Sequence, residues 1–531
     1  MREAGMIANR LWLIGLAAAS AVYFAVLAHW TPFGLADEGY LDYIAWRVQA
    51  GDQPFRDIEL FTYAPGLFYL WAGWFHLFGV SVGTARGLGV LLGACNAALA
   101  YRAARAVGAG RLSALFAAAV ILVGYPCLFR GHIPLINLAA LLLALQALRS
   151  VRWRIWLAGL GALVILGAAL RIDAAAAAAA LTLVVILLKA EERGRQFAPA
   201  VMAGASGAAA AAAAIGGLFA YTGVLQGWLA QLAAFVPFAT RRSVAWYKLP
   251  FPGFSSHLGA DILPALMVSA ALLSAAAAAV AWRARQKTLT DEWRCFALLA
   301  VLGAVNLPQF LIERPDADHL ADHAFVFVLL AMALISAPAL SAAVGGLGTR
   351  NRRLVQTGAF AALAVYAAWS ATAGGSALSA AREPGRPMAL SGEAVRIAST
   401  QGLPEALALL SRDLAPTEPL ASLPFAPGVN FLLRRPLPSP QINFLPYNQQ
   451  RANSQAQLLA GLARPALRYV FLQPPFQMGP DPRANIVCYA PQVAGVLEAN
   501  FAAVAANPEV WVLRKGGRST LPAVRCGPGP S

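Results

Sequence analysis

Two adjacent carboxylates, Asp37 and Glu38, directly follow the first apolar segment of the sequence. Neighbouring side chains point in different directions on any regular backbone, so one carboxylate can act as a base while the other binds a hydroxyl or a cation. A solvated helix end is the plainer interpretation of the same pair. The loop behind the pair is rich in charge and contains Asp42, Arg47, Arg56, Asp57 and the turn Tyr63-Ala64-Pro65.

A second group of polar residues lies where two later apolar segments end. Arg130, Gly131 and His132 form one part of it, and Arg171 and Asp173 form the other. The planar fork of an arginine side chain matches the oxygens of a phosphate group, so arginines at a bilayer edge indicate a phosphate site. Arginines that only anchor helices at the lipid headgroups are the alternative.

A third polar run separates two apolar segments and reads Glu313-Arg314-Pro315-Asp316-Ala317-Asp318-His319. Carboxylate oxygens and imidazoles are metal ligands, but the spacing here matches no specific metal template. A loop that only caps two helices is the alternative interpretation. The sequence thus offers three charged loops and leaves open which of them carry chemistry.

The composition indicates whether the helices that hold these loops lie in water or in a membrane. Hydrophobic residues make up 59% of the 531 residues and charged residues only 12%, whereas an ordinary soluble chain is about a quarter charged. Apolar runs of roughly 18 to 24 residues are each long enough to cross a hydrocarbon core of about 30 Å as a helix. The net charge of +16 lies in short basic clusters between these runs, as topology signals do, and does not indicate a nucleic-acid partner.

We predict a polytopic α-helical membrane domain over residues 1–372. Its eleven spanning helices are expected at residues 11–29, 86–105, 112–129, 135–149, 154–170, 174–189, 198–222, 261–282, 294–312, 323–345 and 353–372. A twelfth apolar stretch, 63–82, breaks the charge pattern if it spans, because the arginine clusters then face outward. We therefore predict an interfacial or re-entrant helix there, within a first outer loop over 30–85. A true span with mixed topology is the alternative.

A soluble extracytoplasmic α/β domain is predicted over residues 373–531, since an odd number of spans from an inside start places the tail outside. We expect a helix over 392–413 with a break at Pro404, and strands at 469–472 and 510–513. Cys488 and Cys526 lie in this tail, where an oxidising compartment permits a disulfide. The other cysteines, Cys95, Cys127 and Cys295, are expected to be packing residues.

The first loop carries a resemblance to a known superfamily. From Ala36-Asp37-Glu38-Gly39-Tyr40 through Phe55-Arg56-Asp57 and Tyr63-Ala64-Pro65-Gly66 to Phe78-Gly79 and Arg86, the sequence resembles the GT-C glycosyltransferases. More narrowly, it looks like the bacterial relatives of protein O-mannosyltransferases and aminoarabinose transferases, the glycosyltransferase 39 family. The run from Arg314 to Leu320 and the segments 423–431 and 449–471 look like later parts of such proteins.

The resemblance implies an inverting transferase that moves a sugar from a polyprenyl-phosphate donor to an acceptor hydroxyl of a lipid, glycan or protein. The reaction would take place at the outer face of the bacterial cytoplasmic membrane. By similarity, Asp37 would be the general base. The cations at the leaving phosphate would be Arg130, Arg171 and Arg314, and Glu38, Asp316 and His319 would also bind substrate.

The second outer loop departs from the pattern of oligosaccharyltransferase-like members. Those members place acidic metal ligands there, whereas this chain reads Arg130-Gly131-His132-Ile133-Pro134. We therefore expect no metal site and no required cofactor, although a divalent cation stays an open alternative. Two other functions also stay open, namely a transporter or flippase for a lipid-linked or small polar substrate and a polysaccharide polymerase or ligase. A transporter predicts charges near helix centres or an internal repeat, and neither is visible in the sequence.

Overall fold

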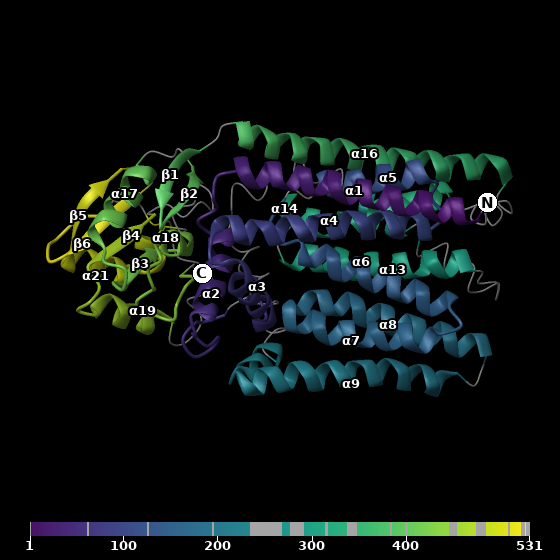
Figure 1. Ribbon diagram of the computed structural model, residues 1–531, viewed down its shortest axis with the longest axis horizontal. Coiled ribbons are helices and arrows are strands. Elements are labelled where there is room, and N and C mark those ends of the chain that lie inside the picture. Colours follow the sequence, from purple (N-terminus) through teal and green to yellow (C-terminus); the bar gives the residue numbers. More distant parts are fainter. Residues whose placement is uncertain are drawn as a thin grey trace.

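A bundle of long helices forms one end of the molecule and a small α/β domain forms the other (Figure 1). The computed structural model describes residues 2–60, 63–124, 127–193, 196–233, 268–274, 276, 291–313, 317–336, 348–382, 385–398, 402–444, 454–473, 485–507, 510–521 and 526. The N-terminus lies at the end of the bundle that is remote from the α/β domain (Figure 1). The predicted class, a polytopic membrane protein with a C-terminal α/β domain, is confirmed.

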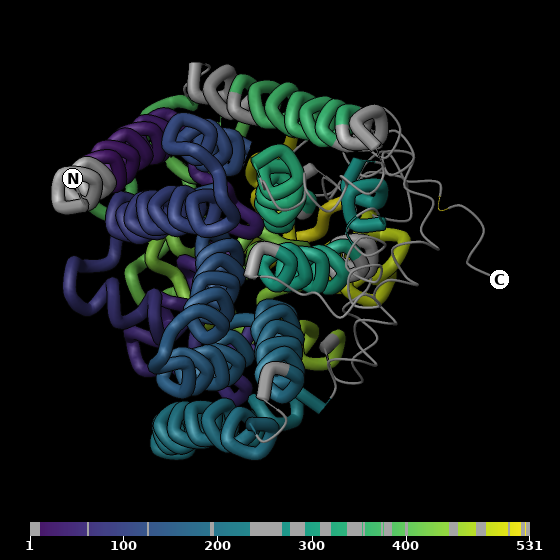
Figure 2. Tube along the Cα trace, turned by 90° about the vertical axis from the view of Figure 1, so that its right-hand side faces the viewer, coloured from purple at the N-terminus to yellow at the C-terminus, as the bar shows by residue number. Residues whose placement is uncertain are grey.

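The long helices of the bundle are α1 Arg2–Trp30, α4 Val82–Ala106, α5 Arg111–Val123, α6 His132–Arg149, α7 Trp153–Leu170, α8 Ile172–Arg193, α9 Phe197–Tyr221, α13 Asp291–Glu313, α14 Ala317–Ser336 and α16 Gly348–Arg382. Among the described residues, six segments are long and apolar enough to cross a membrane: Leu11–Trp30, Val82–Ala106, His132–Arg149, Trp153–Leu170, Ile172–Glu191 and Phe197–Tyr221. A view along the long axis shows the bundle end on, with α16 and α9 at opposite edges (Figure 2). This is a multi-pass membrane protein.

Most predicted spans coincide with a described helix. The prediction at 261–282 lies mostly outside the described residues, and so does the end of the prediction at 323–345. Helix α16 continues to Arg382, past the predicted domain boundary at 372. Residues 373–382 are mainly alanine, glycine and serine without a proline, so nothing stops the helix inside this stretch.

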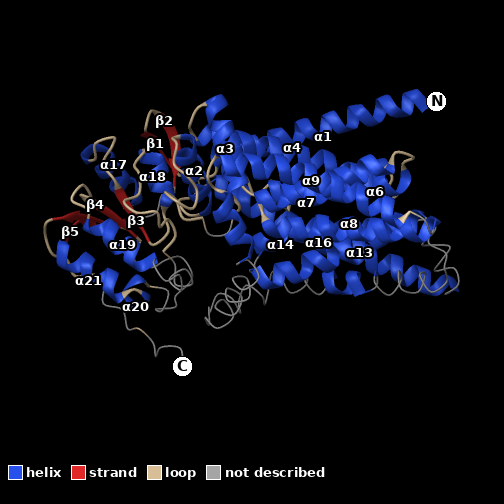
Figure 3. Cartoon of the chain, turned by 90° about the horizontal axis from the view of Figure 1, so that it is seen from below, coloured by secondary structure: helices blue, strands red, loops and turns tan. Residues whose placement is uncertain are grey.

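Two shorter helices, α2 Asp37–Gln49 and α3 Pro65–Phe78, lie between the bundle and the α/β domain (Figures 1 and 3). Helix α3 has 14 residues, which gives a length of about 21 Å and falls short of a hydrocarbon core of about 30 Å. Pro65 begins it, and Gly79 ends it with a φ of 84°. The helix predicted at 63–82 is therefore present and too short to span, and its place at the lipid interface stays a prediction.

The C-terminal domain contains a hairpin and a four-stranded sheet, and all named strands lie in it (Figure 3). Its elements are β1 Arg386–Leu390, β2 Glu393–Ile397, α17 Leu403–Asp413, β3 Leu420–Leu423, α18 Pro427–Leu433, α19 Ser454–Ala463, β4 Tyr469–Leu472, α20 Ile486–Tyr489, α21 Pro491–Asn500, β5 Phe501–Ala506 and β6 Trp511–Lys515. The sheet order is β3-β4-β6-β5; β3 and β4 are parallel and the other pairs antiparallel.

The predicted strands are present as β4 and β6, but the helix predicted over 392–413 is wrong in its first half. Ser391 and Gly392 both have positive φ and form the turn of the β1-β2 hairpin, in which Leu390 and Glu393 pair. A two-residue turn of this kind favours a hairpin and removes residues 393–397 from the helix. Pro404 stands in the first turn of α17 and starts that helix, where its missing N–H costs nothing.

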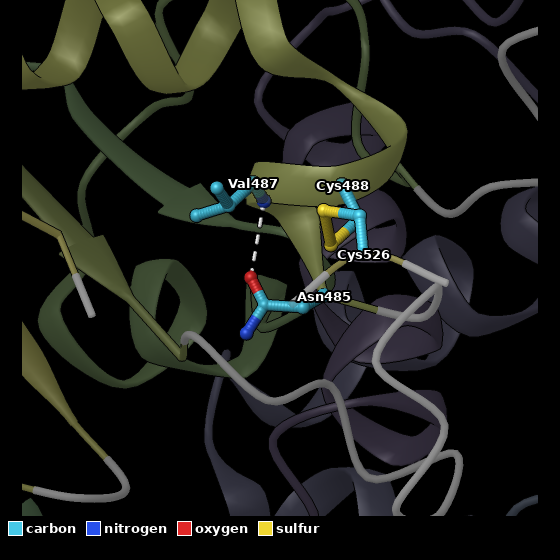
Figure 4. Close-up of a disulfide and its surroundings, with 4 residues drawn as sticks. All are labelled: Asn485, Val487, Cys488 and Cys526. Carbon is cyan, nitrogen blue, oxygen red and sulfur yellow. Dashed lines mark hydrogen bonds between the residues drawn. A yellow bond between two sulfur atoms is a disulfide. The ribbon is translucent and has the colours of Figure 1, made fainter. Parts of the chain in front are cut away.

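Cys488 and Cys526 form a disulfide, with their Cα atoms 5.4 Å apart (Figure 4). Cys488 belongs to the short helix α20, which begins where the Asn485 side chain accepts a hydrogen bond of 3.0 Å from the Val487 N–H (Figure 4). The bond ties residue 526 to the α/β domain. The permitted pairing is thus present.

Helix α2 is fastened to the α/β domain by a close approach of two glycines. A Cβ atom added at Gly39 would lie 2.3 Å from the Cα of Gly428, and one added at Gly428 would lie 2.7 Å from the Cα of Leu35. The Gly428 N–H also donates to the Leu35 carbonyl over 2.9 Å. Around this contact, the rings of Phe33 and Phe75 stack on Phe431. The domain and the first loop therefore share one hydrophobic core.

We expect Gly39→Ala to loosen this contact. Its methyl group would overlap the backbone of Gly428, and the overlap can be relieved only if α2 moves away from α18. Limited proteolysis of the purified full chain should then cleave between the bundle and the α/β domain faster than in the wild type. Gly73→Ala is the matched control, since a Cβ there meets nothing within 4 Å. Equal cleavage of the Gly39 variant and the wild type would contradict the expectation.

Candidate active site

Asp37 stands at the first residue of α2, at the end of the bundle next to the α/β domain. Its carboxylate benefits from the unpaired N–H groups of the helix N-terminus. The side chain is 48% exposed, and its Oδ2 accepts a bond of 2.9 Å from the Nη2 of Arg130. The structure thus brings a reachable carboxylate of the first loop into contact with a cation of the second.

Arg130 lies in the short connection between α5 and α6 and is buried, with 8% of its side chain exposed. Its Nη1 lies 3.9 Å from Oδ2 of Asp322, a fully buried residue of α14. Its guanidinium also lies over the Phe129 ring, 5.3 Å from the centroid. One arginine therefore faces two carboxylates from two different helices.

Arg171 and Asp173 form a second charged pair, at the junction between α7 and α8. The Arg171 Nε donates to both carboxylate oxygens of Asp173, over 2.8 Å and 2.7 Å, and both residues are buried. The Arg171 guanidinium lies over the ring of Tyr63, 5.6 Å from its centroid. Burial raises the pKa of Tyr63, against the lowering effect of Arg130 and Arg171, so its hydroxyl is neutral near pH 7.

His132 is the first residue of α6 and is buried, with a relative exposure of 1%. Its ring lies 6.2 Å from those of Tyr63 and Trp71, measured between centroids. Neither ring nitrogen has a hydrogen-bond partner among the described residues. Tyr63 therefore lies between His132 and Arg171. It connects the Arg171–Asp173 pair to the segment between α5 and α6 that contains Arg130.

Glu38 points away from Asp37 into the protein, with 10% of its side chain exposed. Its Oε1 accepts from the Arg86 Nε over 2.6 Å, and its Oε2 accepts from the Arg86 Nη2 over 3.0 Å and from the Gly34 N–H over 2.8 Å. The two adjacent carboxylates thus diverge as expected. Both oxygens of Glu38 accept hydrogen bonds within the protein, and its role as a substrate ligand stays a prediction.

Arg86 ties three segments together. Besides Glu38, it donates to the carbonyls of Ala28 and Thr31 over 2.6 Å and 2.8 Å and to that of Pro32 over 3.1 Å. These carbonyls belong to the end of α1 and the chain that leads into α2. The arginine therefore fixes the position at which α2 begins, and with it the position of Asp37.

A further charge cluster, partly buried, joins the start of α4 to the α/β domain next to α2. Arg434 donates to Glu393 over 3.1 Å, and Glu393 accepts from the Val82 N–H at the start of α4 over 2.9 Å. The neighbouring Asp42 is 1% exposed, and burial, followed by the charge of Glu38, raises its pKa well above the usual range. The start of α4 is thus tied to the β1-β2 hairpin, and Asp42 of α2 lies in the field of the same charges.

A small, mainly apolar cavity with room for about one water molecule lies inside the bundle near the site. It is lined by Phe24, Gly93, Asn96, Ile121, Leu122, Cys127, Gly131, Pro134, Ala321 and Phe325. Gly131 follows Arg130, and Ala321 precedes Asp322. The packing beside the buried cation is therefore mainly apolar.

Asp37 and Arg130 are in direct contact, and Arg171 lies beside them against the ring of Tyr63. Arg314 and Asp316 lie outside the described residues, and His319 lies in the first turn of α14 with its side chain undescribed. Asp322, a residue of α14 that is not among the predicted site residues, is also part of this group. Among the described residues, no group of three His, Cys, Asp or Glu side chains is arranged to hold a metal ion.

The whole chain matches no protein-family model and no curated protein sequence. The structure of ArnT from Cupriavidus metallidurans bound to undecaprenyl phosphate superposes with a TM-score of 0.54 and 14% identity, over 95% of this chain and 97% of that one. The apo ArnT structure gives 0.52 and 15%, over 97% and 98%. The chain has a GT-C glycosyltransferase fold.

The GT-C fold extends over both parts of the molecule, because the two ArnT superpositions include the bundle and the C-terminal domain alike. An oligosaccharyltransferase from Archaeoglobus fulgidus, in complex with zinc and sulfate, matches with a TM-score of 0.45 and 13% identity, over 94% of this chain and 73% of that one. At these identities the likeness concerns the fold, and the chemistry has to be argued from the residues.

Proposed function

We propose that this protein is an inverting glycosyltransferase that moves a sugar from a polyprenyl-phosphate donor to an acceptor hydroxyl. The observation that carries the proposal is the contact between the half-exposed Asp37 and the buried Arg130, at one end of a membrane bundle. A base and a phosphate-binding cation at the end of an apolar helix bundle suit a donor whose lipid part stays in the bilayer. ArnT, which shares the fold, was crystallised with undecaprenyl phosphate.

In the proposed reaction, Asp37 takes the proton of the acceptor hydroxyl while that oxygen attacks the anomeric carbon of the sugar. The bond from this carbon to the phosphate oxygen breaks, its electron pair stays on the phosphate, and polyprenyl phosphate leaves from the opposite face. The anomeric centre is thereby inverted. Arg130 and Arg171 stabilise the charge that develops on the leaving phosphate.

The remaining predicted residues take two different roles in the proposal. Arg314 and Asp316, which precede α14 in the chain, and His319 in its first turn are proposed to bind substrate. Glu38 is proposed to position Asp37 through Arg86, because both of its oxygens are already bonded. Acceptor hydroxyls of a lipid, a glycan or a protein all fit this chemistry.

We propose that the site and the C-terminal domain lie outside the cytoplasmic membrane of a bacterium. Both lie at the same end of the bundle (Figure 1), and the domain contains a disulfide, which an oxidising compartment favours. The basic clusters between the apolar segments support the same orientation. No nucleotide-sugar pool exists on that side, so a donor delivered within the bilayer is required.

Mass spectrometry of lipid-linked sugars tests the proposal. Cells that lack the protein should accumulate one polyprenyl-phosphate sugar and lose one sugar from an envelope lipid, glycan or protein. Purified full chain in lipid nanodiscs should then consume the accumulated lipid and release free polyprenyl phosphate. Movement of the lipid across vesicles without any glycosylated product would favour the transporter alternative, and extension of a glycan chain would favour the polymerase.

Transfer should not depend on a divalent metal, since the Asp37 carboxylate already has the Arg130 guanidinium as its cation. We expect the rate of purified protein in excess EDTA to stay within about twofold of the rate in magnesium or manganese. A loss of activity in EDTA that manganese restores would contradict this expectation and indicate a metal-dependent reaction.

A further inference from the structure

The two Nη groups of Arg130 face two carboxylates that differ in burial. Its Nη2 is 2.9 Å from Asp37, whose side chain is 48% exposed, and its Nη1 is 3.9 Å from Asp322, whose side chain is 0% exposed. The Nε of Arg130 has no hydrogen-bond partner among the described residues. The solvent side of the guanidinium is thus bound to a group that a ligand can reach, and the inner side faces one that a ligand cannot reach.

Asp322 is unusual for a buried carboxylate. Neither of its oxygens accepts a hydrogen bond from any described residue. A buried charge without hydrogen bonds is costly, and such groups in membrane helices mark functional positions. Arg130 is therefore the cation that balances the charge of Asp322, across 3.9 Å and without a hydrogen bond.

We propose that Asp322 is a positioning residue that holds Arg130 while a polyprenyl phosphate takes the Nη2 group from Asp37. This inference rests on the proposed function. A phosphate oxygen competes for the same N–H as Asp37, because both are charged acceptors. When the phosphate is bound, Asp37 is released to accept the proton of the acceptor hydroxyl, and Asp322 keeps the guanidinium in place.

The same arrangement limits how tightly the leaving lipid is held. Asp37 and Asp322 together carry two negative charges against the single positive charge of Arg130. Their repulsion of a bound phosphate favours its release after the sugar has been transferred, and Asp37 then regains Arg130. Donor binding and activation of the base are thereby coupled through one arginine.

The affinity of undecaprenyl phosphate for the full chain in nanodiscs tests this inference. We expect Asp322→Asn to bind this lipid about three- to tenfold more tightly than the wild type, because one repelling charge is removed. Asp322→Glu should return the affinity toward the wild-type value. In an Arg130→Gln background, Asp322→Asn should change the affinity much less, since the two residues then no longer interact.

Asp52→Asn is the matched control, because it removes a carboxylate from the same end of the molecule where it pairs with Arg47, not with Arg130. Unchanged or weaker binding by a folded Asp322→Asn variant would overturn the inference, and a damaged site would not produce tighter binding. If the wild type binds undecaprenyl phosphate no better than undecaprenol, the proposed function itself fails. The two failures are therefore distinguishable.

Discussion

Asp37→Asn should lower the rate of sugar transfer by about a thousandfold while the protein still inserts and folds. The amide occupies the same space and can still contact Arg130, but it cannot take a proton from the acceptor hydroxyl. The initial rate of polyprenyl phosphate release in nanodiscs measures the effect. Binding of undecaprenyl phosphate should persist in this variant, which separates a defect of chemistry from a defect of binding.

Asp57→Asn serves as the control for this prediction. Asp57 lies in the same loop and is bound to Arg56 and to the Gln53 N–H, in contact with solvent. Its loss should change the rate less than about twofold, as for most surface substitutions. Substantial transfer by the Asp37 variant would remove Asp37 from the mechanism.

Arg86→Met should destabilise the protein strongly. The substitution leaves Glu38 buried and unpaired and also frees the carbonyls of Ala28 and Thr31, and breaking a buried pair in this way costs about 3–5 kcal/mol. Thermal unfolding of the purified protein in detergent should show a lower midpoint, and any folded fraction should transfer sugar more slowly because Asp37 is no longer fixed.

Two variants show whether the buried pair is the cause. Adding Glu38→Gln to Arg86→Met removes the unpaired charge and should recover part of the lost stability. Arg47→Met breaks the more exposed pair with Asp52, in which the side chains are 21% and 26% exposed, and should cost at most about 1 kcal/mol. Equal midpoints for Arg86→Met and Arg47→Met would show that the Glu38 pair contributes little.

The features that the sequence predicted well depend on short stretches of chain. Apolar length decides whether a helix can cross a bilayer, and the charge between apolar runs decides that 63–82 is not such a helix. The divergence of Asp37 and Glu38 follows from backbone geometry alone. The helix predicted over 392–413 is wrong at its start because Gly392 belongs to the turn of the β1-β2 hairpin, although the Ser391-Gly392 pair is itself a local turn signal.

The sequence by itself determined the membrane class and most of the helices, and it marked the carboxylate pair at the start of α2. Only the tertiary structure decided the partners, because Arg130 and Asp37 are 93 positions apart and Arg86 and Glu38 are 48 apart. Such pairs depend on how helices pack and rotate against one another, which the periodicity of one helix does not specify. For this reason the sequence indicates a substrate-binding role for Glu38 from its neighbour Asp37, whereas its buried pair with Arg86 is visible only in the tertiary structure.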